Sequence, residues 1–145
     1  MDDAQGGQDI IIYINETPVY YIEVKSRWIS ADSVMMSASQ LDRSVEKKDC
    51  YSLFAVDMVG FNGENVKEHV YPDTMEEFID RIRVVKNIGE LNDEILPTKR
   101  DPHEEVHIGG DYKAVVPQNL IGRNHIDYNS FSRNVLIPKV IEALN

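Results

Sequence analysis

The stretch YYIEVKSRW, Tyr20 to Trp28, places two charged residues, Glu23 and Lys25, inside a run of residues that favour burial. A buried strand is normally an uninterrupted apolar run. Charges inside a sheet cost free energy unless they are paired, hydrogen-bonded or bound to a metal. The stretch therefore predicts a central strand that carries either a functional site or an ion pair.

The residues on either side of this strand predict a β-β-α-β order. Asp9 to Ile14 is rich in β-branched residues, residues 15–18 (NETP) have turn chemistry, and Val19 to Ser26 is typical of a second strand. After a predicted loop over residues 27–36, Ser37 and Gln40 have the spacing of a capping box, which predicts a helix to about residue 48. Residues 51–58 (YSLFAVDM) predict the next strand.

The second half of the chain is less regular. Residues 61–64 predict a turn, 66–71 a short strand, and 73–84 a helix, whereas 83–103 have weak periodicity. A hairpin is expected from residues 106–108 and 112–116, and a final helix from about residue 129. Pro138 should break that helix or open a second one.

Length and composition predict one domain over residues 1–145. The predicted elements make it an α/β (α+β) domain with a core at about 6–84 and a C-terminal extension at about 104–145, and the resemblance described below implies a mixed sheet. A single cysteine, Cys50, cannot form an internal disulfide, and no apolar run is long enough for a membrane span. We therefore expect an intracellular, cytoplasmic protein that does not enter membranes. Because the first predicted strand starts so near residue 1, we also expect a C-terminal fragment of a longer protein.

The net charge of −10 has the wrong sign for a protein that coats nucleic acid with a broad basic surface. The local charge differs, since Lys25, Arg27, Arg43, Lys47 and Lys48 lie close to the central stretch. The composition therefore argues against a general basic coat and leaves a local anion-binding site open.

Alternation along a strand puts Glu23 and Lys25 on one face. Asp9, on the neighbouring strand, can join them if the hairpin loop has an odd number of residues or a bulge corrects the register, whereas a plain four-residue loop would place Asp9 opposite Val24. Two carboxylates and a lysine are the groups needed for metal-assisted phosphodiester hydrolysis. Asp9, Glu23 and the Val24 carbonyl would bind Mg²⁺ or Mn²⁺, and Lys25 would act on the attacking water.

The sequence contains Asp9, then a gap of thirteen residues, and then Glu23-Val24-Lys25. This pattern resembles the PD-(D/E)XK nuclease superfamily. More narrowly, the segments GQDIIIY, YYIEVKSR, SASQLDRS and CYSLFAVDM, within residues 6–58, resemble the C-terminal domain of the plant NO VEIN protein, a domain of unknown function. Related bacterial copies often follow an ATPase or helicase module.

The superfamily resemblance implies a restriction-endonuclease-like core, divalent-metal-dependent cleavage and a polar residue from the following helix, which Gln40 matches. The usual proline before the first aspartate is Gln8 here, and the acidic residue that many members supply from an earlier helix cannot be assigned, because the sequence starts too close to Asp9.

These observations favour a Mg²⁺-dependent nuclease-like domain acting on DNA, with Asp9, Glu23, Lys25 and Gln40 as the site. The alternative is a catalytically inactive module of the same fold that binds nucleic acid or a partner protein for a larger ATPase-containing chain. A third interpretation is an ordinary ion pair, worth roughly 0 to 1 kcal/mol on a surface, with Asp9 and Glu23 facing apart. Gln40 has a structural alternative as the third helical residue of a capping box. The sequence leaves monomer and homodimer open.

Overall fold

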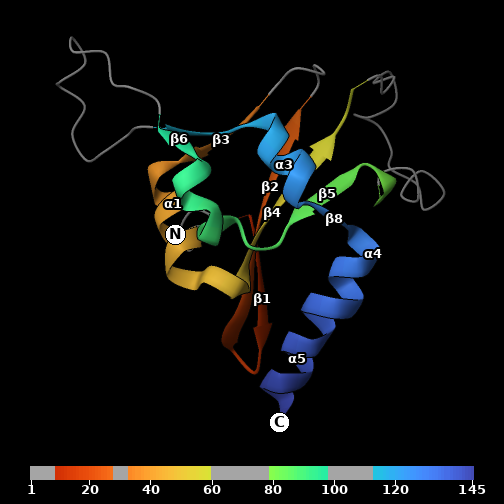
Figure 1. The fold of residues 1–145 in the computed structure, drawn as a ribbon. Helices are drawn as coiled ribbons and strands as arrows, with labels where there is room; N and C mark the ends of the chain where they lie inside the picture. Colours follow the sequence, from red (N-terminus) through yellow and green to blue (C-terminus); the bar gives the residue numbers. More distant parts are fainter. Residues whose placement is uncertain (1–8, 28–32, 60–78, 98–112) are drawn as a thin grey trace, which may run out of the picture.

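The computed structural model describes residues 9–27, 33–59, 79–97 and 113–145, which form a mixed α/β fold (Figure 1). Its main sheet has five strands in the order β1-β2-β4-β5-β8. The strands are β1 (Ile10–Ile14), β2 (Thr17–Arg27), β4 (Tyr51–Asp57), β5 (Ile82–Val85) and β8 (Ile126–Asp127). β2 and β4 run parallel, and the other neighbouring strands are antiparallel.

A smaller antiparallel sheet has the order β3-β7-β6, and short helices surround both sheets. The strands are β3 (Val34–Ser37), β6 (Leu96–Pro97) and β7 (Lys113–Val116). The α-helices are α1 (Ala38–Lys47), α3 (Gln118–Asn124), α4 (Tyr128–Phe131) and α5 (Ile137–Leu144), the 3₁₀ segments η2 (Lys48–Cys50) and η4 (Ile88–Glu94), and the π segment η6 (Ser132–Leu136). None of the helices in the described ranges is long and apolar enough to cross a membrane.

The two faces of the main sheet bury separate apolar clusters. On one face, Leu53 packs in a cluster that reaches α1, α3 and the smaller sheet. On the other face, Tyr20 and Phe54 pack edge-to-face on Phe131 of α4, with ring centroids 5.5 Å and 5.2 Å apart. Because both faces of the sheet are covered near the middle of β2, a charged side chain there, such as Glu23, is held away from bulk water.

The β1-β2 hairpin contains the irregularity on which the predicted site depends. Its turn is the two-residue Asn15-Glu16, both with positive φ (50° and 68°), and not the predicted loop of residues 15–18. The register then shifts between Ile12 and Tyr13, so that Val19 is the extra residue of a bulge. Beyond the bulge Ile10 pairs with Ile22.

The predicted β-β-α-β order is confirmed, with β3 added before α1. Ser37 caps α1 in the predicted capping box, and Pro138 lies in the first turn of α5, where it opens a second helical segment. The π segment before it joins α4 to α5 without a break.

Two expectations were wrong. Residues 34–36 are not loop but pair with β7, a partner about eighty residues away that local sequence does not reveal. The helix expected to reach residue 84 has ended by Arg81, and residues 82–85 form β5 because pairing with β4 outweighs their helical spacing. Helix α3 was not predicted. The expected turn at 61–64 and the strands at 66–71 and 106–108 lie outside the described residues.

Candidate metal and phosphodiester site

Glu23 lies at the centre of the sheet and is only 1% exposed. Its strand, β2, runs between β1 and β4, and Glu23 pairs in register with Leu53 of β4. A carboxylate in such a position loses its hydration, so it is costly unless other groups replace the water.

One oxygen of Glu23 has partners and the other has none. Oε2 accepts a hydrogen bond from Gln40 Nε2 at 3.0 Å and lies 3.2 Å from Lys25 Nζ. Oε1 is buried and has no hydrogen-bond partner among the described residues. Burial, opposed by the Lys25 charge and assisted by the Asp9 charge, raises the pKa of Glu23 from 4.5 to about 7. The structure therefore holds a desolvated carboxylate with one buried oxygen that has no hydrogen-bond partner among the described residues.

Asp9 lies at the start of β1, next to Glu23. Its N–H donates to the Ile22 carbonyl at 3.1 Å, and its Oδ2 accepts from the Val24 N–H at 2.9 Å. Without the bulge, the register would place Asp9 opposite Ile22 and on the other face of the sheet. The effect of Asp9 on the pKa of Glu23 agrees with two neighbouring carboxylates and not with two that face apart.

The Val24 carbonyl faces the same edge of β2 as Asp9. The N–H and C=O of one strand residue leave on the same side, and the Val24 N–H already meets Asp9 there. The backbone oxygen predicted as a ligand is thus on the side where the two carboxylates meet.

Gln40 completes the predicted capping box and also contacts Glu23. Its Oε1 accepts from the Ser37 N–H at 2.8 Å, which completes the capping box, while its Nε2 donates to Glu23. The start of α1 is therefore tied directly to the central carboxylate.

Sequence reasoning missed Tyr51, a fully buried residue at the start of β4. Burial, followed by the charges of Glu23 and Asp9, raises the pKa of the Tyr51 phenol. No spacing in the sequence indicated this neighbour, because it reaches the site only through the parallel pairing of β2 and β4.

These donors fit a divalent cation that prefers oxygen. Two carboxylates and a carbonyl are ligands of the kind that Mg²⁺ uses, with water or phosphate oxygens in its remaining positions, and the unpartnered Oε1 of Glu23 supplies an oxygen that needs a partner. Within the described ranges, no group of three or more His, Cys, Asp or Glu side chains converges. The set therefore resembles a site that binds the ion jointly with water or substrate.

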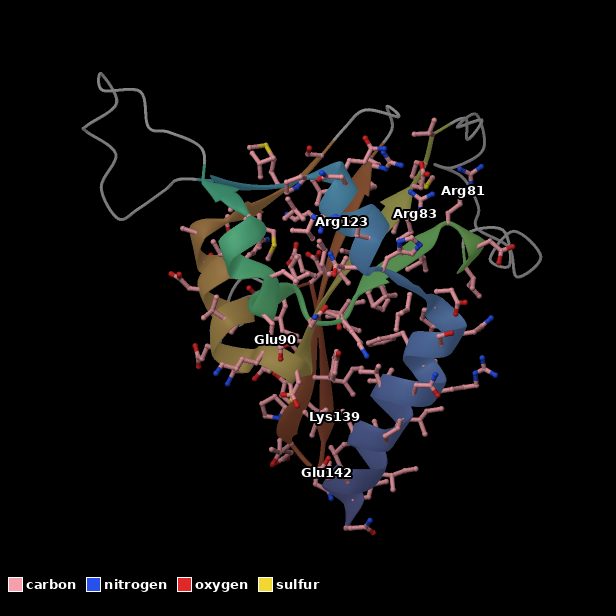
Figure 2. The ribbon with its side chains drawn as sticks, in the orientation of Figure 1. Arg81, Arg83, Glu90, Arg123, Lys139 and Glu142 are labelled. Carbon is pink, nitrogen blue, oxygen red and sulfur yellow. The ribbon has the colours of Figure 1, made fainter. Side chains whose placement is uncertain are left out.

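A separate hollow of about 520 Å³ lies where β4 begins and β5 ends. It is lined by Asp49, Lys86, Asn87, Glu90, Asn134, Val135, Pro138, Lys139 and Glu142. Figure 2 shows three of these residues, Glu90, Lys139 and Glu142, in the lower half of the molecule. Lys139 Nζ is 2.7 Å from Asp49 Oδ2, and the lining mixes both signs of charge, so it indicates no single class of ligand.

Fold and site together define a mixed α/β domain with a carboxylate-lysine centre on β2, an interior strand of its main sheet. Residues 2–70 match the family described as Protein NO VEIN, C-terminal. This range contains β1, β2, α1 and β4, and with them the whole candidate site. No curated protein and no solved structure matches the chain. The resemblance of residues 6–58 to this family is thus confirmed, and the wider nuclease superfamily stays a prediction.

Proposed function

We propose that this domain hydrolyses phosphodiester bonds in DNA with the help of Mg²⁺ or Mn²⁺ bound at Asp9 and Glu23. The observation that carries the proposal is the buried Glu23 carboxylate, which has one oxygen fixed by Lys25 and Gln40 and the other without a partner. A structural ion pair gains nothing from an unpartnered buried oxygen. Strain of this kind is typical of a functional site.

The proposed roles follow from the contacts. Asp9, Glu23 and the Val24 carbonyl would hold the ion, which would act as a Lewis acid on the phosphate. Gln40 fixes Glu23 by holding Oε2, which directs Oε1 to the ligand. Lys25, whose side chain is 27% exposed, can meet substrate while it contacts Glu23. Its ammonium would orient the attacking water and offset the charge that develops on the phosphorane.

The second candidate is a module of the same fold that docks nucleic acid or a partner protein for a larger ATPase-containing chain and does not catalyse cleavage. The net charge of −10 favours it, as does the pairing of only two acidic side chains at the described site. An enzyme requires the metal, whereas a docking module does not.

Titration of Mn²⁺ into the wild-type domain and into Glu23→Ala by isothermal calorimetry tests the proposal first. We expect binding by the wild type and none by the variant, and then metal-dependent cleavage of DNA that Lys25→Ala abolishes without changing the circular dichroism spectrum. Lys86→Ala, which removes an exposed lysine at the separate hollow, is the matched control. Unaltered cleavage by Lys25→Ala would remove the proposed mechanism, and wild-type DNA binding without metal binding would favour the docking module.

A further inference from the structure

Cationic side chains continue from the candidate site along the same face of the sheet. Lys25 pairs with Ala55 of β4, and Ala55 pairs with Arg83 of β5, which makes one row across three strands. One step further along the strands, Arg27 pairs with Asp57. Lys25, Arg27 and Arg83 therefore lie around Ala55, which is itself buried at 3% exposure, so a ligand can meet these side chains only at their exposed ends.

Asp57 organises these arginines. Its Oδ2 is 3.2 Å from Arg27 Nη2 and 3.3 Å from Arg83 Nη1, while its Oδ1 accepts from the Val59 N–H at 3.1 Å. Arg81 lies beside it, donating from Nη1 to the Asp57 carbonyl at 2.9 Å. Burial of Asp57 is outweighed by these hydrogen bonds and charges, so the pKa of its carboxyl falls below its usual value.

Three arginines lie around Asp57. Its carboxylate pairs with two of them, Arg27 and Arg83, and its backbone carbonyl accepts a hydrogen bond from the third, Arg81. Arg27 is buried at 8% exposure, whereas the Arg83 side chain is 38% exposed and can reach a ligand. Figure 2 shows Arg81 and Arg83, together with Arg123 of α3, in the upper half of the molecule, away from Lys139 and Glu142. The chain thus concentrates basic groups here despite its net charge of −10.

We propose that Arg83, held by Asp57 beside Arg27, binds a backbone phosphate of a nucleic-acid strand that also contacts the partly exposed Lys25 side chain. A guanidinium fixed by a carboxylate keeps further N–H donors in a defined plane, and that geometry suits phosphate oxygens. This inference rests on the proposed function, which is the reason to expect a nucleic-acid strand at Lys25.

The test is fluorescence anisotropy of a labelled DNA oligonucleotide without divalent metal, at several salt concentrations. We expect Arg83→Ala to weaken binding by roughly tenfold, since it removes a charge-assisted hydrogen bond, and to lower the slope of log K against log salt by about 1. Arg83→Lys keeps the positive charge, so the slope of log K against log salt should stay close to that of the wild type. Binding by this variant shows that a substitution at residue 83 leaves the protein folded. Arg133→Ala, which removes an exposed arginine beside α4, is the matched control and should change neither quantity.

The outcomes separate this inference from the proposed function. DNA binding that depends on Arg83, with no cleavage in the presence of any divalent metal, would support the phosphate site and exclude the proposed nuclease activity. Metal-dependent cleavage with equal binding by Arg83→Ala and Arg133→Ala would support the enzyme and overturn the phosphate site. Arg83-dependent binding of inorganic phosphate but not of DNA would also overturn it, because the site would then take a free ion.

Discussion

Replacing Glu23 with Gln should stabilise the protein at pH 8 while it destroys the site. The folded protein holds the Glu23 proton with a pKa of about 7, compared with 4.5 when the carboxyl is solvated. Between these two values the folded state binds a proton that the unfolded state has lost, so stability falls as the pH rises, by about 1.4 kcal/mol per pH unit. The stability that this group contributes is fully present below pH 4.5 and is lost as the pH passes 7.

The whole loss is about 3 kcal/mol above pH 7, and an amide at this position avoids it. Because Gln leaves Lys25 without its partner, we expect a net gain of about 1 to 3 kcal/mol at pH 8, and little difference between the two proteins at pH 4. Urea unfolding followed by circular dichroism at pH 4, 6 and 8 measures both curves. Glu46→Gln, an exposed glutamate with a 64% exposed side chain, is the control and should change stability by less than about 0.5 kcal/mol.

The same proton competes with a metal ion. Mn²⁺ affinity of the wild type should fall by up to about tenfold for each pH unit below 7, because the ligand must be deprotonated, and Glu23→Gln should lose calorimetric binding at every pH. A wild-type stability that is flat from pH 4 to pH 8, together with no gain from Glu23→Gln, would refute the argument that the buried carboxylate is strained.

Two further changes test the geometry. Deletion of Val19 should remove the bulge and turn Asp9 to the other face of the sheet. Calorimetry should then detect weakened or lost Mn²⁺ binding, while the protein keeps its secondary structure. Mn²⁺ binding with wild-type affinity would contradict the proposed register. Gly89→Ala should lower the free energy of unfolding by about 2 to 4 kcal/mol, because its Cβ would lie 1.9 Å from a backbone carbonyl oxygen of α1. Gly122→Ala has no atom within 4 Å of the new Cβ and should be neutral or stabilising, so equal urea midpoints for the two variants would exclude the close contact.

Much of the candidate site could be predicted because it rests on local rules. Alternation along a strand fixes Glu23 and Lys25 on one face, and a capping box fixes Gln40 at the start of α1. The sequence could say only that Asp9 joins Glu23 if the hairpin loop has an odd number of residues or the strand contains a bulge. It could not say which of these occurs. Tyr51 and Arg83 could not be predicted, because each reaches this face through pairing with strands distant in sequence.

By itself, the sequence determined which segments are apolar, where α1 begins and that Glu23 and Lys25 share one face of a strand, because these features depend on side chains a few positions apart. Only the tertiary structure decided that residues 34–37 and 82–85 are strands, since each needs a partner strand whose position depends on how the whole chain folds. It also decided that a bulge at Val19 follows the two-residue turn. That single extra residue turns Asp9 toward Glu23, because side chains alternate along a strand with a period of two.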